Sequence, residues 1–253
     1  MNYKILIALI TFLSYFFLPA AFAAADESTL NKAIDRAGLQ RMLTQRMLKS
    51  YCQVGQDQFY IKPEEQLQSA LQRYEEGLQY LEDFRDVKGV TVSLNKINAI
   101  WPENKKLILD VPSRDALPGL IDMNEKLLAL SHQIVLDLHA KSGKKLGKVI
   151  NISGRQRMLS QRMELYYLEK NWDFDAYEGE FEKAHNAFSD GLEFLNAYSG
   201  NTDEVSQLLA KADKSFKLFN HTVTVKDNAF MISLTTGQML DYMNTATGLY
   251  SNM

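Results

Sequence analysis

Residues that build cross-links, metal sites and irregular loops are scarce in this chain of 253 residues. It has one cysteine, four histidines, 13 glycines and five prolines. The single cysteine, Cys52, excludes an intramolecular disulfide and a cysteine-based zinc site. With 46% hydrophobic and 23% charged residues, the composition is that of a globular protein and excludes a collagen-like or low-complexity chain.

The chain also lacks a basic excess and a long apolar run after its first residues. Its formal net charge is −3, so its overall charge argues against a nucleic-acid-binding surface, which needs a basic stripe. The longest later aliphatic cluster, residues 127–138, is interrupted by Ser131, His132, Gln133 and Asp137. We therefore expect no membrane-spanning segment beyond residue 24.

The first 23 residues have the organisation of a secretory signal peptide. Lys4 precedes an apolar run from Ile5 to Leu18, Pro19 ends the run, and residues 21–23 read Ala-Phe-Ala. The run is too short for a membrane anchor, which needs about 20 apolar residues. We expect cleavage after Ala23, with Ala25 as the alternative. An acidic, exported chain without disulfides is typical of the bacterial periplasm.

The rest of the chain is a tandem duplication. The segment GLQRMLTQRM, residues 38–47, recurs as GRQRMLSQRM at residues 154–163, and residues 70–81 align with residues 184–195. A repeat of this kind defines the architecture before any chemistry is considered. We predict a first repeat over residues 24–140, a basic linker over residues 141–148, and a second repeat over residues 149–253. The sequence leaves open whether the repeats form one pseudo-symmetric body or two separate bundles.

Each repeat is predicted to fold as four helices, giving an all-α protein of antiparallel four-helix bundles. In the first repeat the first helix contains residues 38–47, and the second begins near Pro63, a residue suited to the first helical turn. The third is expected from Ser93 to about Asp110, kinked or restarted at Pro102. The β-branched clusters at 90–92 and 222–225 are too short to build a sheet. Apolar residues recur at helical spacing in the second helix (Leu67, Leu71, Tyr74, Leu78, Leu81) and in a fourth (Leu120, Met123, Leu127, Leu130, Ile134, Leu138).

The duplicated segment predicts a binding site for a small anion. In a helix, residues three and seven positions apart share a face, so each glycine lies on the same face as an arginine and a glutamine. A hydroxyl residue precedes each glutamine, which adds another hydrogen-bond donor. The candidate binding residues are Gly38, Arg41, Thr44 and Gln45 in the first repeat and Gly154, Arg157, Ser160 and Gln161 in the second.

A structural role for the two arginines is the alternative. Arg41 and Arg157 would then form salt bridges across the bundle to acids such as Asp35, Glu75 or Glu164. If the two motif helices pair, however, two guanidinium groups converge and require a counter-charge, which an anion would supply. A second pair of arginines, Arg46 and Arg162, is predicted to make separate contacts further out.

The motif Gly-x-x-Arg-Met-x-(Ser/Thr)-Gln-Arg-Met resembles that of the PilJ-type domain, the N-terminal domain of type IV pili methyl-accepting chemotaxis transducers. It is also similar to the P-box of nitrate and nitrite sensor kinases. The resemblance implies a periplasmic four-helix sensor bundle in which facing arginines of two subunits hold one nitrate. By position, Arg41 and Arg157 correspond to those arginines, and Gly38 and Gly154 to the residues of close approach.

No motif points to catalysis, a cofactor or a metal. Glu182-x-x-His185 is the one Glu-x-x-His segment, whereas a di-iron bundle needs two. We therefore expect no enzyme, but a periplasmic module that binds a small anion such as nitrate or nitrite and acts with a membrane-bound chemoreceptor or sensor kinase. The alternative is a structural or interaction protein of the cell envelope, linked to pili or chemoreceptors, without a small-molecule ligand.

Overall fold

The computed structural model describes residues 19–58, 62–174, 179–225 and 228–253, with the backbone alone for 19–27. Most of the predicted signal peptide lies outside these ranges. The described residues contain no strand, which confirms the all-α prediction. The elements are α1 (Pro19–Gly55), α2 (Pro63–Leu81), the 3-10 turn η2 (Glu82–Phe84), α3 (Lys88–Ile108), α4 (Leu117–Ser142), α5 (Lys145–Asn171), α6 (Glu180–Asn196), α7 (Asp203–Thr222) and α8 (Ala229–Ser251).

The helices form two halves with the same internal arrangement. In the first half, α1 packs against α2 and α4, and α3 packs against α4. In the second half, α5 packs against α6 and α8, and α7 packs against α8. The predicted linker between the halves is mostly helical, and only its residues Gly143 and Lys144 lie outside α4 and α5. Gly143 adopts a left-handed conformation (φ 66°), a common way to end a helix.

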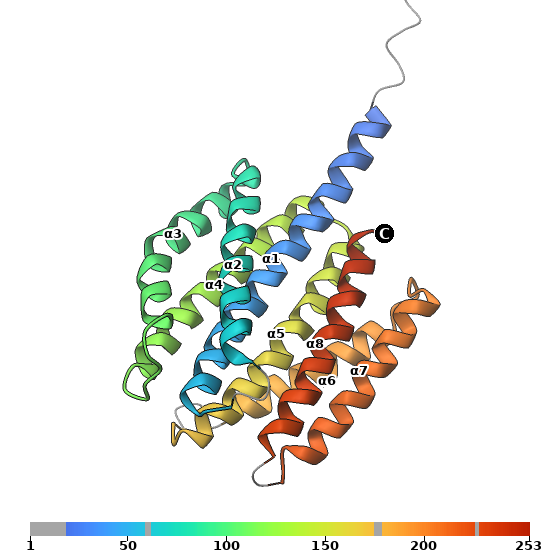
Figure 1. Ribbon diagram of the computed structural model, residues 1–253. Helices are drawn as coiled ribbons and strands as arrows, with labels where there is room; N and C mark the ends of the chain where they lie inside the picture. The colour runs from blue at the N-terminus through green and yellow to red at the C-terminus, as the bar shows by residue number, and fades with distance from the viewer. Residues whose placement is uncertain (1–18, 59–61, 175–178, 226–227) are drawn as a thin grey trace, which may run out of the picture.

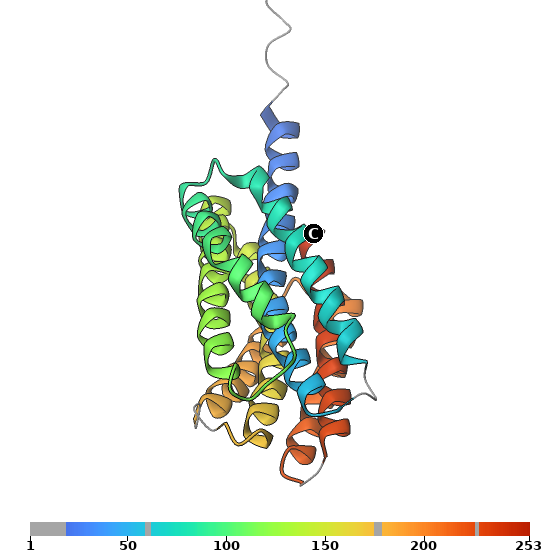
Figure 2. The ribbon, with the colours of Figure 1, turned by 60° about the vertical axis from the view of Figure 1, so that its left-hand side comes forward.

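The two halves form one body through α1 and α5. These helices make the most extensive contact in the molecule, and α1 also touches α8 while α5 touches α4. In Figure 1, α1 and α5 lie between the outer helices of the first half and those of the second, and Figure 2 shows the same helices turned by 60°. They run parallel: Gly38 faces Gly154, and near the ends of both helices Gln56 donates a hydrogen bond to the carbonyl oxygen of Leu168. The contacts are thus related by an approximate two-fold axis along the helix pair.

The predicted helices agree with the structure except in the third. Helix α3 begins at Lys88, five residues before Ser93, and continues through Pro102, so a restart at this proline is wrong. Val90, Thr91 and Val92 lie in its first turns, where Val90 is buried in the core, because tertiary packing overrides their weak helix propensity. In α2 all five predicted apolar positions are buried, as are four of the six in α4, while Met123 and Leu130 are half-buried.

Among the described helices, none combines the length and the apolar character that crossing a membrane requires.

The closest approach of α1 and α5 depends on two glycines. A Cβ atom added at Gly38 would lie 3.9 Å from the Cα of Gly154, and one added at Gly154 would lie 3.8 Å from the Cα of Gly38. Each added atom would also lie 3.2–3.3 Å from side-chain nitrogens of two buried arginines. The contacts with the arginine nitrogens are tighter than ordinary van der Waals distance, so a side chain at either position requires the buried guanidinium groups to shift.

We therefore predict that Gly154→Ala destabilises the protein by about 1–3 kcal/mol, the cost of overpacking, although alanine is the better helix former. Gly237→Ala is the matched control, because Gly237 is also helical and open space surrounds its Cβ position. That variant should be neutral or stabilised by up to about 1 kcal/mol. Thermal unfolding of both variants measures the difference, and equal stability of Gly154→Ala and the unmodified protein would refute the close-packing argument.

Candidate functional site

The interface between α1 and α5 follows a coiled-coil-like seam. Positions 34, 38, 41, 45, 48 and 52 are separated by four and three residues in turn, and every one of them is buried. Their counterparts 116 residues later, from Ile150 to Leu168, are buried as well. The seam therefore places Arg41 next to Arg157, and Gln45 next to Gln161, along the pseudo-two-fold axis.

The two arginines converge at the glycine crossing. The Nη2 atoms of Arg41 and Arg157 both lie within 3.3 Å of the Cβ position of Gly38, and equally close to that of Gly154. The two guanidinium groups are therefore separated by no more than the sum of two such distances. Arg41 is 1% exposed and Arg157 is 2% exposed. Two buried cations this close together repel each other and need compensation.

Each arginine reaches across to the other half of the molecule. Arg41 donates to the side-chain oxygen of Asn151 at 2.9 Å, to its carbonyl oxygen at 3.1 Å, and to Nδ1 of His132 at 3.1 Å. Arg157 forms an ion pair with Oδ1 of Asp35 at 2.7 Å and donates to its carbonyl oxygen at 3.2 Å. It also donates to Oδ1 of Asn244 at 3.2 Å.

The structural alternative thus applies to one arginine of the two. Of the three acids considered, Asp35 pairs with Arg157, whereas Glu75 pairs with Lys105 and Glu164 with Lys49. Among the side chains that the structure describes, no carboxylate forms an ion pair with Arg41, whose partners are all neutral oxygens or an imidazole nitrogen. The site therefore contains two cations and one carboxylate.

The electrostatics of the site reflect this imbalance. Burial, together with the charges of Arg157 and Arg155, lowers the pKa of Arg41 to about 9. Burial likewise lowers the pKa of His132, assisted by the nearby charges of Arg41 and Arg155. Since Arg41 is the donor in their contact, His132 is neutral there and accepts through Nδ1.

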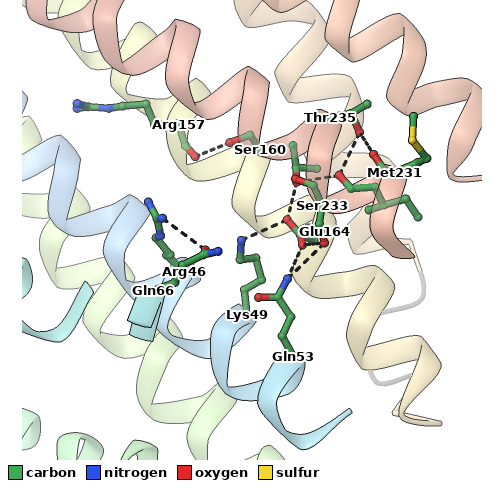
Figure 3. Close-up of polar contacts among 12 residues, drawn as sticks. Arg46, Lys49, Gln53, Gln66, Arg157, Ser160, Glu164, Met231, Ser233 and Thr235 are labelled. Atoms are coloured by element: carbon green, nitrogen blue, oxygen red, sulfur yellow. Dashed lines mark hydrogen bonds and ion pairs between the residues drawn. The ribbon is translucent and has the colours of Figure 1, made fainter. Parts of the chain in front are cut away.

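The remaining candidate residues are two hydroxyl residues and two glutamines on the same helices as the arginines. The hydroxyl groups bond to carbonyl oxygens of their own helices, and the glutamines are buried. Thr44 donates its hydroxyl to the carbonyl oxygen of Arg41 at 2.9 Å, and Ser160 donates to that of Arg157 at 2.8 Å, as Figure 3 shows for Ser160. Gln45 and Gln161 are fully buried one turn further along the helices. Several buried polar atoms in this described region have no hydrogen-bond partner: Nε of both arginines, Oε1 of Gln45, and Nε2 and Oε1 of Gln161.

A glutamine and a glycine, present once in each half, help to position the motif helices, although the motif analysis of the sequence did not identify them. The side chains of Gln40 and Gln156 lie directly over Gly77 of α2 and Gly191 of α6, where an added Cβ would be 1.8 Å and 1.9 Å from the amide nitrogens. Gln40 recurs as Gln156 and Gly77 recurs as Gly191, and this recurrence is the signal that could have identified them. Each glycine therefore leaves room for the glutamine and allows α2 or α6 to pack closely against the helix that holds the arginine.

Another buried polar cluster lies further along the same seam and breaks the pseudo-symmetry (Figure 3). Glu164, fully buried, accepts from Gln53 at 2.7 Å, from Ser233 and Thr236 at 2.5 Å each, and from Lys49 at 3.4 Å. The equivalent of Glu164 in the first repeat is Leu48, and the equivalent of Lys49 in the second is Leu165. The positions related to this ion pair by the pseudo-two-fold axis thus hold two leucines, and the ion pair has no counterpart on the other side.

Arg46 and Arg162, the second predicted pair, contact other side chains. Arg162 forms an ion pair with Glu125 of α4 at 2.5 Å, and Arg46 donates to Gln66 of α2 at 3.4 Å. Among the described residues, no group of three or more histidine, cysteine or acidic side chains is arranged to hold a metal ion.

The Lys49–Glu164 pair leads to a testable stability prediction. Glu164→Leu leaves a buried lysine without its carboxylate and should destabilise the protein by about 3–5 kcal/mol. The double variant Lys49→Leu with Glu164→Leu replaces the ion pair by two leucines and should recover most of that loss. Urea denaturation of the single and double variants measures the coupling. A double variant no more stable than Glu164→Leu would show that the pair does not act as a unit.

Comparison with known proteins finds a family match in the first half of the chain. Residues 22–115 match the family described as type IV pili methyl-accepting chemotaxis transducer N-term, PilJ. The matched segment contains α1 from residue 22, α2 and α3, and includes Gly38, Arg41, Thr44 and Gln45. No curated protein and no solved structure matches the chain significantly.

Proposed function

Because residues 22–115 are a PilJ-type domain, the sensor-like module of chemotaxis transducers, we propose that this chain binds a small anion such as nitrate or nitrite between Arg41 and Arg157. The observation that supports the proposal is the buried pair of arginines with a single carboxylate between them. In this proposal residues 149–253 are a second PilJ-type copy, and the chain builds within one molecule a site of the kind that two subunits form in the sensor kinases.

The energetics favour an anion at Arg41. The guanidinium now donates to neutral acceptors, and hydrogen bonds to a charged acceptor are stronger, about 1.5–3 kcal/mol each. The unpartnered Nε atom of Arg41 and the unpartnered amide nitrogen of Gln161 provide further donors for a ligand. After the cost of association, three or four such bonds correspond to a dissociation constant between about 1 mM and 1 μM.

An anion could reach Arg41 without unfolding of the bundle. The side chains that cover the guanidinium are His132, which is exposed, and Asn151, which is half-buried. Arg157 is covered in the equivalent way by Asn244, which is exposed, and by Asp35, which is half-buried. Each arginine therefore contacts side chains that reach the surface, and in this proposal rotation of these side chains opens the site.

We further propose that the module is periplasmic, is exported by the signal peptide predicted at residues 1–23, and reports occupancy to a membrane-bound chemoreceptor or sensor kinase. The bound anion would lie between α1 and α5, the helices that join the two halves. Any change in their packing therefore reaches both halves, and a partner that contacts either half can detect it.

Anion binding should raise the melting temperature, because a ligand that binds only the folded state stabilises it in proportion to its concentration. We expect nitrate or nitrite to raise it progressively in a thermal-shift titration at constant ionic strength. Arg41→Gln should abolish the increase while the protein remains folded. Arg114→Gln, which removes an exposed arginine paired with Asp173, is the matched control and should respond like the unmodified protein.

If none of nitrate, nitrite, chloride and sulfate shifts the melting curve, and Arg41→Gln and Arg157→Gln only reduce stability, the proposal is wrong. The arginines would then be structural, and a cell-envelope interaction protein without a small-molecule ligand would be the supported function.

Binding should also strengthen as the pH falls from about 8 to 5.5. In the free protein, burial and the charges of Arg41 and Arg155 hold the pKa of His132 below its ordinary value near 6.5. A bound anion offsets those charges and raises that pKa, so binding takes up a proton and is tighter at low pH. Calorimetric titration at several pH values measures the effect, and His132→Gln, which keeps an acceptor, should flatten it. An unchanged pH profile in that variant would exclude His132 from the site.

A further inference from the structure

The two halves of the site differ in formal charge at one pair of equivalent positions that contact the arginines. Asp35 and Asn151 are related by the same shift of 116 residues as the two arginines. Asn151 accepts hydrogen bonds from Arg41 through its side-chain oxygen and its carbonyl oxygen, whereas Asp35 accepts one from Arg157 through its carbonyl oxygen and forms an ion pair with it through Oδ1. Each residue therefore contacts the arginine of the other half, but only Asp35 adds a negative charge.

We propose that Asp35 determines the charge of the ligand, so that the site accepts a singly charged anion and rejects a doubly charged one. The ligand lies on the Arg41 side, next to Asn151 and His132. This inference rests on the proposed function, since it specifies which anions the same site binds.

The charge balance supports a monovalent ligand. Arg41, Arg157 and Asp35 together have one excess positive charge, which a single negative charge neutralises. A dianion would leave a net negative charge among buried groups, and an uncompensated buried charge is strongly unfavourable. Arg155 is exposed and Arg73 half-buried, so solvent and salt screen these neighbouring charges more than those of the buried pair.

The same asymmetry selects the side on which the ligand binds. On the Arg157 side, the carboxylate of Asp35 already occupies a guanidinium nitrogen at 2.7 Å and would repel an anion. On the Arg41 side, the covering groups are an amide and a neutral imidazole, which can exchange their contacts with Arg41 for contacts with an anion. Asn151 can then also donate through its amide nitrogen.

The duplication provides nearly isosteric exchanges that test the proposal. Asn151→Asp places a carboxylate on each arginine and should abolish nitrate binding. Asp35→Asn leaves two cations without a carboxylate, and it should increase the affinity for sulfate relative to nitrate by at least about tenfold. Calorimetric titration with nitrate, nitrite, chloride and sulfate at constant ionic strength measures these ratios, and circular dichroism checks that each variant is folded.

The double exchange Asp35→Asn with Asn151→Asp provides the sharpest control, because it preserves the total charge and moves the carboxylate to the other arginine. It should retain the preference for monovalent anions. Binding should then be lost on adding Arg157→Gln, and reduced less on adding Arg41→Gln, the reverse of the order in the unmodified protein.

The outcomes separate this inference from the proposed function. If the unmodified protein binds none of the four anions, the proposed function itself fails. If it binds nitrate but binds sulfate equally well, or if Asn151→Asp still binds nitrate normally, the role of Asp35 is overturned while anion binding stands. Should Asp35→Asn fail to fold, Asn151→Asp and the double exchange test the same charge argument.

Discussion

The structure depends on the burial of two like charges at one helix crossing. Arg41 and Arg157 meet where Gly38 and Gly154 allow α1 and α5 to approach, and both side chains are almost completely buried. Their repulsion is offset by oxygen atoms from the opposite half: the carbonyls of Asp35 and Asn151 and the side chains of the same two residues. The arginines therefore link the two halves. Their positive charge is only partly compensated, because one carboxylate pairs with the two of them.

A tandem chain can use this arrangement in a way that a symmetric dimer of identical subunits cannot. Equivalent positions can hold different residues, and two seam features show this. Asp35 faces Asn151 across the pseudo-two-fold axis, and Glu164 with Lys49 occupies positions where the other copy has Leu48 and Leu165. The buried ion pair lies on one side of the pseudo-two-fold axis, and leucines occupy the equivalent positions on the other side. In the same way, the single carboxylate paired with the arginines lies on one side, next to Arg157.

Much of this could be predicted from the sequence, and the failures have physical causes. The duplication predicts two equivalent helical halves, and the motif spacing predicts that glycine, arginine and glutamine share a face, because both arguments are local. Partners of the arginines are not local. Asp35 was considered as a partner for either arginine, but it pairs with Arg157 because α1 and α5 are parallel and a long guanidinium side chain spans the interface. Thr44 and Ser160 turn to their own helix carbonyls, a competition that spacing alone does not resolve.

The contacts of the two arginines also explain how occupancy of the proposed site could affect the whole molecule. Arg41 of α1 holds His132 of α4 and Asn151 of α5, while Arg157 of α5 holds Asp35 of α1 and Asn244 of α8. One polar cluster centred on the two buried arginines therefore links four helices, two from each half. In the proposed complex, an anion replaces the contacts of Arg41 with α4 and α5 but leaves those of Arg157 in place. The bound state thus differs from the free state mainly in the contacts that α1 makes with α4 and α5. A conformational signal requires such a difference in contacts between the two states.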